Sequence, residues 1–401
     1  MKFFAKGELK LLWPFYLEIL ISTLFFIYPA FWIIQLQESL SLTQIGFLFA
    51  AISISSFLFE VPTGAIADIY GRKVSTILGY FLCGFAVISI FFVSNFYGLL
   101  IIFFLWGIFG TFISGAKQSW VADNLKFNKR SELLENFFIK YSSFIKISLF
   151  LAGFIGAFFV KQFGLDIIWM VTGISLIISG LILLPTKEYK ISKDADKSFK
   201  GLMNQSHSSI KYGLKHKILL GLIVAIFFVS FWNTFGGDIV WQPFLRNIGF
   251  PIYAFGLLFS GITLVGAFVP YLAKPLLKKI GKENKFLALM ILVQILIVIL
   301  VLFAGHWIFG VLLLLLAHTA FDLYSPIRMN YFQRFVPSKM RATITSFEGM
   351  IVALAFALAA PLAGFLGDTF GPRITISISG IFLIPAVVIY LRIKEGKHGE
   401  K

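Results

Sequence analysis

Seven charged side chains lie inside long apolar stretches of the chain, and these are the residues whose chemistry needs an explanation. A charge held at the centre of a bilayer costs at least ~2.5–3.5 kcal/mol on insertion scales. Residues kept at that cost usually face a cavity, a charged partner or an ion pathway. We therefore take them as the first candidates for function: Glu18, Glu60, Lys117, Lys146, Asp322, Arg328 and Glu348.

Three side chains are predicted to carry protons: Glu18, His318 and Asp322. Glu18 lies in the first apolar stretch, where an acid can carry a proton or meet a cationic substrate; the alternative is a structural pair with a basic neighbour. His318 and Asp322 are four residues apart and share one helix face, and histidine titrates near neutral pH. The pair predicts a proton relay, and the alternative is a hydrogen-bonded pair that only holds the helix in place.

The composition indicates that much of the surface faces lipid. The chain has 401 residues, of which 58% are hydrophobic and 13% are charged, whereas soluble domains carry roughly 25% charged residues. A helix needs about 20 apolar residues to cross the hydrocarbon core. The sequence predicts twelve such helices, near residues 11–36, 43–67, 74–94, 97–121, 138–161, 166–185, 218–243, 251–277, 285–304, 306–332, 340–366 and 371–392.

The basic residues set the predicted orientation. A net charge of +16 could suggest nucleic acid, but these residues lie in short loops between apolar stretches, so we exclude nucleic acid as a partner. If both termini are cytoplasmic, 29 of the 35 Lys and Arg residues lie on the cytoplasmic side and 3 lie in outer loops. This bias predicts a multi-pass protein of a bacterial inner (cell) membrane with both termini in the cytoplasm.

The predicted domains are two six-helix bundles, residues 1–185 and 218–401, joined by a basic cytoplasmic linker at 186–217. Such a layout is typical of two parallel repeats related by an axis along the membrane normal. Cys83 is the only cysteine, and the sequence contains no GxxxxGK[ST] loop and no metal-ligand cluster. We expect no cofactor, no metal, no use of ATP and no enzymatic activity.

The loop between the second and third stretches carries a motif. Residues 64–73 read GAIADIYGRK and follow Glu60-Val-Pro-Thr63. This resembles the GxxxDxxGR[RK] signature of the major facilitator superfamily, in the EVPTGxxAD form of a bacterial branch. The resemblance implies an all-α fold of two pseudo-symmetric six-helix bundles, and a cytoplasmic latch between them formed by Asp68, Arg72 and Lys73. The alternative is that Arg72 and Lys73 only set the topology.

The resemblance also assigns a gate and a cavity. A run from Ser114 to Asp123, Pro326-Ile-Arg328 and Arg341-Ala-Thr343 are similar to segments of that branch. The predicted cytoplasmic gate adds Glu60, Asp123, Arg341 and Glu348 to the latch residues. Aligning Gly71 with Gly281 gives an offset of 210 between the halves, and nearly the same offset, 211, pairs Lys117 with Arg328, whose stretches the resemblance makes symmetry mates. The predicted substrate cavity comprises Tyr28, Gln35, Lys117, Gln118, Asn233, Tyr324 and Arg328.

The predicted function is secondary active transport by alternating access, with proton-coupled efflux of a small lipophilic or cationic compound. The fifth stretch has Gly153 and Gly156 but lacks the proline of the family's antiporter motif, which counts against antiport. Proton-coupled uptake of a small nutrient is the alternative, and a non-transporting membrane receptor or enzyme is a distant one. The expected partners are a small-molecule substrate, protons and the lipid bilayer, and we expect a monomer.

Overall fold

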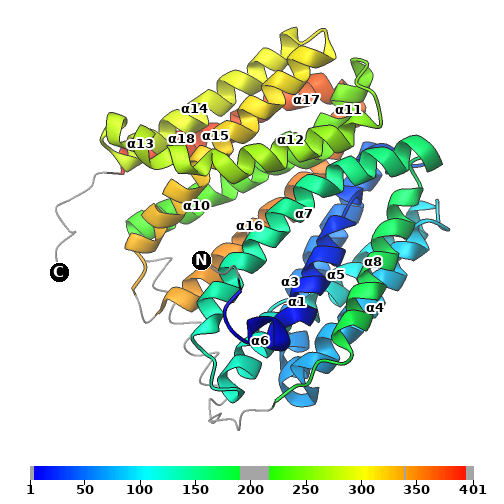
Figure 1. The fold of residues 1–401 in the computed structure, drawn as a ribbon. Helices are drawn as coiled ribbons and strands as arrows, with labels where there is room; N and C mark the ends of the chain where they lie inside the picture. Colours follow the sequence, from blue (N-terminus) through cyan, green and yellow to red (C-terminus); the bar gives the residue numbers. More distant parts are fainter. Residues whose placement is uncertain (1–3, 190–215, 338–339, 394–401) are drawn as a thin grey trace. The chain divides into compact units, whose positions relative to one another are not determined.

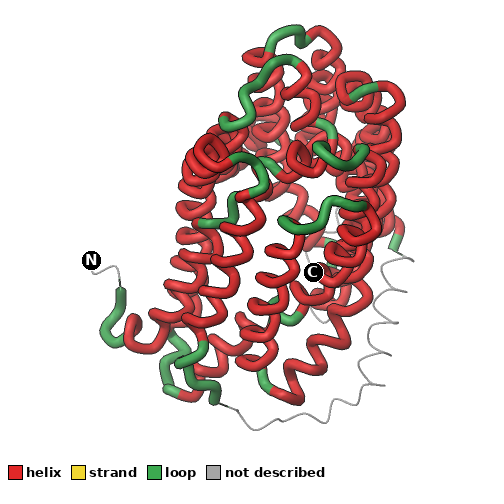
Figure 2. The backbone as a smooth tube through the Cα atoms, turned by 90° about the vertical axis from the view of Figure 1, so that its right-hand side faces the viewer, coloured by secondary structure: helices red, strands yellow, loops and turns green. Residues whose placement is uncertain are grey.

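Helices form all the regular secondary structure that the computed structural model describes, which covers residues 4–189, 216–337 and 340–393 without the side chains of 236–238 and 342–343 (Figures 1 and 2). The first half contains α1 (Glu8–Leu24), η1 (Tyr28–Ala30), α2 (Trp32–Leu36), α3 (Leu42–Tyr70), α4 (Arg72–Ile90), α5 (Phe96–Thr111), α6 (Ala116–Phe127), α7 (Leu133–Phe163) and α8 (Ile167–Leu183). The second half contains α10 (Lys217–Asn233), the π-helix η2 (Thr234–Ile239), α11 (Trp241–Asn247), α12 (Ala254–Phe268), α13 (Pro270–Ile280), α14 (Glu283–Leu300), η3 (Val301–Phe303), α15 (Trp307–Arg334), α16 (Arg341–Phe370), α17 (Pro372–Ser379), η5 (Gly380–Leu383) and α18 (Ile384–Arg392).

The helices are long and apolar enough to cross a membrane, as the sequence predicts. Nine helical segments of the described residues pass that test, and α12 with α13 makes a tenth if the pair, bent by 51°, is one span. Two shorter apolar helices, α8 and α10, have 17 residues each. One of these segments lies in each of the twelve predicted stretches. The count of twelve stays a prediction, because α8 and α10 are shorter than the length that spans the hydrocarbon core.

Two compact units divide the chain, one formed by Met1–Lys193 with Pro251–Leu264 and the other by Asp194–Phe250 with Val265–Lys401. The sequence predicts a division at 186–217, and most of that linker, 190–215, lies outside the described residues. The contacts group most of α12, up to Leu264, with the first unit because α7 and α12 approach closely. Ser260 Oγ donates to the carbonyl of Phe150 at 2.6 Å, and a Cβ on Gly153 would lie 2.2 Å from the carbonyl oxygen of Gly256.

Small residues also bring helices together inside the first unit. A Cβ added to Gly84 on α4 would lie 2.9 Å from the carbonyl oxygen of Gly173 on α8, and one added to Gly173 would lie 2.7 Å from that of Gly84. Helices in a membrane associate by such close packing, since lipid offers no hydrophobic driving force between them. Large apolar side chains such as Phe92 and Ile101 are exposed instead. The surface is thus suited to lipid.

Candidate functional site

A buried ion pair lies in the first unit, between α1 and α6. Lys117 Nζ lies 3.2 Å from both carboxylate oxygens of Glu18. The Glu18 side chain is 0% exposed and that of Lys117 is 11% exposed. Two buried charges are tolerated only when their geometry and hydrogen bonds offset the loss of water.

Three hydroxyl and aromatic groups complete this arrangement, which we call the Glu18 cluster (Glu18, Lys117, Tyr80, Ser22 and Tyr141). Tyr80 OH on α4 donates to Glu18 and accepts from Lys117 Nζ at 2.9 Å. Ser22 Oγ donates to Glu18 at 3.1 Å. The Lys117 ammonium lies 5.3 Å from the centre of the Tyr141 ring, within cation–π range. Every charge in the cluster therefore has several partners.

A second ion pair lies in the second unit, between α15 and α16. Arg328 Nη1 donates to Glu348 Oε1, and the two side chains are 18% and 14% exposed. Tyr324, one turn before Arg328, shares a 2.8 Å hydrogen bond with Tyr390 OH on α18. This pair is less enclosed than the Glu18 cluster.

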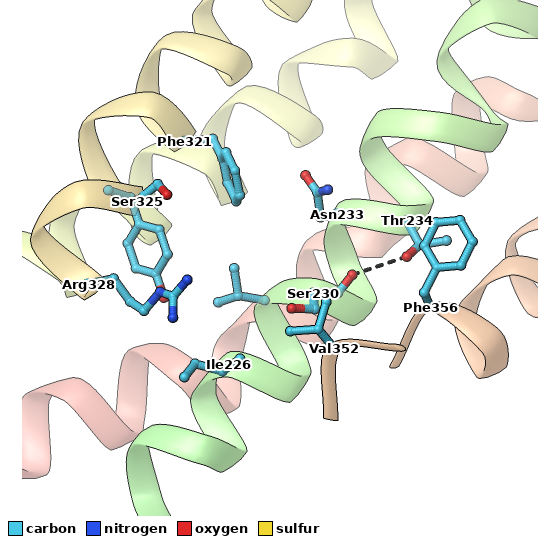
Figure 3. Close-up of a pocket in the computed structure, with 11 residues that line it drawn as sticks. Ile226, Ser230, Asn233, Thr234, Phe321, Ser325, Arg328, Val352 and Phe356 are labelled. Carbon is cyan, nitrogen blue, oxygen red and sulfur yellow. Dashed lines mark hydrogen bonds between the residues drawn. The ribbon is translucent and has the colours of Figure 1, made fainter. Parts of the chain in front are cut away.

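The Arg328 guanidinium borders a cavity of about 210 Å³, which we call the Arg328 cavity (Figure 3). Side chains of α10 approach it from one side and those of α15 and α16 from the others. The lining is half apolar and half polar: Ile226, Val229, Ser230, Asn233, Thr234, Phe321, Tyr324, Ser325, Arg328, Val352 and Phe356. An apolar cleft with a few convergent polar groups is the usual form of a small-molecule site.

The π-helix η2 begins at the edge of this cavity, because α10 ends at Asn233 and Thr234 starts η2. Thr234 Oγ1 donates to the carbonyl of Ser230 at 3.1 Å, the bond dashed in Figure 3. π-Helical turns inside membrane and soluble helices frequently mark functional sites. The local irregularity therefore supports the cavity as the candidate site.

The predicted offset of 211 relates the Glu18 cluster to the Arg328 cavity. Besides pairing Lys117 with Arg328, it takes Glu18 to Val229, Ser22 to Asn233 and Tyr141 to Val352, and these residues of the second half line the cavity. It takes Tyr80 to Ile291, which is not among the lining residues. In this predicted register, the second half has a cation like the first and an apolar side chain in place of the buried acid.

The motif loop forms a third charged group in the first unit. Arg72 pairs with Asp123 on α6 and lies 3.6 Å from Asp68, and Lys73 Nζ donates to the carbonyl of Leu184 at 2.7 Å. Glu188 accepts from the Arg72 backbone N–H at 2.7 Å and so satisfies an orphan donor at the start of α4. These contacts lie within one unit.

The second glycine of that motif, Gly71, is required by the backbone conformation and by a close neighbour. Its φ is +114°, which L side chains rarely adopt. A Cβ there would also lie 2.7 Å from Glu188 Oε2. Only glycine lets the carboxylate reach the helix N-terminus.

The structure places the predicted cavity residues in three settings. Asn233, Tyr324 and Arg328 line the Arg328 cavity. Lys117 belongs to the Glu18 cluster, and Gln118 is exposed. Tyr28 and Gln35 lie near the other end of the first unit. Gln35 donates to Asp166 at 2.7 Å and accepts from Trp169 at 2.8 Å, while the buried Tyr28 ring stacks on Trp169.

The predicted proton-coupling and gate residues are also dispersed. His318 and Asp322 are half-buried on α15, and Asp322 approaches Gly266 of α12, where a Cβ would lie 3.4 Å from its Oδ2. Glu60 accepts from Ser114 Oγ at 2.9 Å. Arg341 is exposed at the start of α16. The roles of these residues stay predictions.

Sequence reasoning missed a further buried pair near the N-terminus. Lys140 Nζ on α7 lies 2.6 and 2.7 Å from the two carboxylate oxygens of Glu8, which is 0% exposed. Tyr16 OH and the Ala5 backbone N–H donate to the same carboxylate, each at 2.7 Å. Glu8 precedes the predicted apolar stretch, so it was not considered as a candidate; Tyr16, eight residues later, is the residue that could have drawn attention to it.

Comparison with known proteins shows the family of this chain. The chain is 23% identical to the MFS-type transporter YxaM of Bacillus subtilis over 377 residues, which cover 91% of each protein. It is 25% identical over 177 residues to an MFS-type transporter of Methanocaldococcus jannaschii, which covers 41% of this chain and 45% of that protein.

Among solved structures, the fold is similar to that of the nucleoside transporter NupG (TM-score 0.75, 15% identity, 95% of this chain and 99% of that one). It is also similar to a D-xylose–proton symporter (TM-score 0.65, 14% identity, 97% and 99%). The sequence profile of the Major Facilitator Superfamily matches residues 17–350 and 222–401. The chain therefore belongs to the Major Facilitator Superfamily (MFS) and is a multi-pass membrane transporter.

Proposed function

We propose that this protein is a proton-coupled secondary active transporter that works by alternating access and exports a small lipophilic compound. Membership of the MFS supports secondary transport of a small molecule. The single observation that carries the proposal is the Arg328 cavity, which is lined by side chains of α10, α15 and α16 and bordered by a partly exposed ion pair. Ionisable residues inside membrane segments mark substrate or ion pathways by default.

The choice of a lipophilic over a cationic cargo rests on the charges around the cavity. Its described lining contains Arg328 and no carboxylate. Glu348 pairs with Arg328, and Glu18 pairs with Lys117. A cationic solute would meet like charge there, whereas Phe321, Val352 and Phe356 offer apolar contact.

Uptake of a polar nutrient is the second candidate, and a specific observation favours it. The cavity also presents Ser230, Asn233, Tyr324 and Ser325, which can hydrogen-bond to a hydroxylated solute. The structural neighbours named above are a nucleoside transporter and a D-xylose–proton symporter. At 14–15% identity these likenesses concern the fold, so they give the alternative modest support.

Protons are the proposed coupling ion, with Asp322 and His318 as carriers on α15 and Glu18 as a further candidate. Glu18 ranks behind the other two candidates because Lys117 and Tyr80 both hydrogen-bond to its carboxylate. Asp322 lies on the helix that also carries Arg328, six residues or about 1.7 turns away. The latch of Asp68, Arg72 and Lys73, the gate residues and cytoplasmic termini in a bacterial inner membrane belong to the same proposal.

The test is transport by the purified protein in proteoliposomes under an imposed pH gradient. Neutral lipophilic dyes, lipophilic cations, nucleosides and sugars would be compared as solutes. We expect dye movement against the proton flux, lost when a protonophore collapses the gradient. Transport that persists without the gradient contradicts proton coupling, and movement of nucleosides or sugars along the proton flux contradicts efflux.

Asp322→Asn tests the proposed carrier in the same vesicles. We expect gradient-driven transport to fall at least tenfold, while counterflow exchange of solute without a gradient persists. The matched control is Asp368→Asn, an exposed acid near the end of α16. Unaltered gradient-driven transport in Asp322→Asn would remove this residue from the mechanism.

A further inference from the structure

A second cavity, of about 300 Å³, lies in the first unit where α1, α6 and the segment after α8 meet. Lys10 and Trp13 of α1, Asn124 of α6, and Thr186 and Lys187 after α8 line it. We call it the Lys10 pocket. None of these residues belongs to the Glu18 cluster or to the Arg328 cavity.

Hydrogen bonds hold the wall of this pocket in place. The Lys187 carbonyl accepts from Asn124 Nδ2 at 2.9 Å and from Trp120 Nε1 at 3.2 Å. The Tyr189 ring stacks on Phe127 with centres 4.0 Å apart and planes at 8°. The segment after α8 is therefore fixed against α6, and the pocket is preformed.

The polar groups of the pocket suit an anion. Lys10 and Lys187 both line it, and neither forms an ion pair with any residue that the structure describes. The Thr186 side chain is more than nine-tenths buried, and its hydroxyl has no hydrogen-bond partner within the described part of the chain. A buried hydroxyl without a partner is costly, so a ligand oxygen would complete it. The neighbouring Glu188 carboxylate is engaged by the backbone of Arg72.

An apolar path leads from the pocket along the outside of the first unit. Leu9, Trp13 and Leu17 are spaced four apart on α1 and are 45%, 46% and 38% exposed, so they share one outward face. The packed neighbour α8 exposes Ile178 and Leu181, and Leu184 directly after it is exposed as well. Trp13 belongs both to the pocket and to this face. Tryptophan is typical of the membrane–water interface, where α1 begins.

We propose that the Lys10 pocket binds the phosphate headgroup of an anionic membrane phospholipid, with its acyl chains along the exposed rows of α1 and α8. Lysines beside helix ends at the cytoplasmic surface attract anionic headgroups, and basic pockets between membrane helices bind them. A free phosphate or phosphorylated solute would satisfy the same cations but would not use the apolar rows. The proposal is independent of the cargo and of proton coupling.

The test measures lipid binding to the full purified chain. Its thermal unfolding in detergent would be followed with added phosphatidylglycerol, phosphatidylcholine or inorganic phosphate, since a ligand of the folded state raises the apparent Tm. We expect a larger rise with phosphatidylglycerol than with phosphatidylcholine, and no rise with phosphate. In Lys10→Gln/Lys187→Gln, phosphatidylglycerol should bind about tenfold more weakly or worse.

The matched control is Lys126→Gln/Lys129→Gln, which removes two exposed charges from the same end of the unit outside the pocket. It should keep the preference for phosphatidylglycerol. If the double pocket variant fails to fold, Thr186→Val keeps both charges and should still weaken binding. Equal responses to the two lipids, equal loss in the control variant, or a response to inorganic phosphate as large as that to phosphatidylglycerol would each overturn the proposal.

Discussion

The Glu18 cluster and the Arg328 cavity, which the predicted offset of 211 relates to each other, have different forms in the two units. Both contain a cation on the corresponding helix, Lys117 on α6 and Arg328 on α15. In the first unit the cation is sealed against Glu18, which is 0% exposed. In the second unit Val229 stands at the position related to Glu18, and Arg328 pairs instead with Glu348 from α16.

The two units therefore use their cations, Lys117 and Arg328, in different ways. A fully partnered pair contributes rigidity but offers nothing to a solute, because its hydrogen-bonding capacity is used internally. A pair beside a cavity can exchange a partner for a ligand. We infer that the first repeat supplies a rigid charged core, and the second supplies the binding surface. Four substitutions can sharpen or break this comparison.

Glu18→Gln should give the largest effect. It leaves the Lys117 ammonium buried without its counter-charge, which costs about 3–5 kcal/mol of the free energy of unfolding. Thermal and denaturant unfolding in detergent would measure the loss. In Glu18→Gln/Lys117→Met the charge is removed together with its partner, so stability should partly return. A double variant as unstable as the sum of the two single variants would show that the pair is not coupled.

Arg328→Gln should act on the solute more than on the fold. Losing a cation that borders the cavity should weaken solute binding or transport about hundredfold, the range measured when a buried charged contact is truncated. The cost in stability should be smaller than for Glu18→Gln, because Arg328 and Glu348 are partly exposed and screened. Arg334→Gln is the control on the same helix, paired with Glu283 away from the cavity. Equal effects of the two variants on transport would contradict the assignment.

Val229→Glu would install in the second repeat the acid that the first repeat has. The new carboxylate should compete with the solute for Arg328, and we expect about tenfold weaker binding. The new side chain of Val229→Gln has nearly the same volume as that of Val229→Glu but no charge. This variant should therefore bind the solute more tightly than Val229→Glu. If the two variants bind equally, volume alone explains the change and the electrostatic comparison fails.

Tyr324→Phe should have the smallest effect. It removes the neutral hydrogen bond to Tyr390, worth about 1 kcal/mol. Tyr80→Phe in the Glu18 cluster removes bonds to two charged groups and should cost about 1.5–3 kcal/mol. Unfolding measurements on both variants check the ranking. A larger loss of stability in Tyr324→Phe than in Tyr80→Phe would contradict the inference that the first repeat supplies the rigid charged core.

Much of the fold follows from patterns that are local in sequence. Apolar stretches of membrane length predicted the helices, and the GxxxDxxGRK motif with the charge bias predicted the family, which the comparisons confirm. Three of the predicted substrate-cavity residues, Asn233, Tyr324 and Arg328, line the Arg328 cavity, and their role in binding a substrate stays a prediction.

Side-chain partners were harder to predict, because each depends on helix rotation and depth. Glu18 could equally carry a proton or meet a basic neighbour, and only packing of α1 on α6 brings Lys117 to it. Gln35 was expected in the cavity, but Asp166 and Trp169 engage both ends of its amide. Glu188 lay in the predicted linker, where nothing in the sequence indicated a cap for α4.

The sequence by itself determined an all-α membrane protein, because hydrophobic length acts residue by residue along the chain, and its GxxxDxxGRK motif implied by resemblance a transporter of two six-helix bundles. Tertiary structure alone decided which charges are sealed and which border a cavity. That outcome depends on contacts between segments about 100 residues apart, such as Glu18 with Lys117. In a low-dielectric interior, a partner within hydrogen-bonding distance decides whether a buried charge is structural or remains available to a solute.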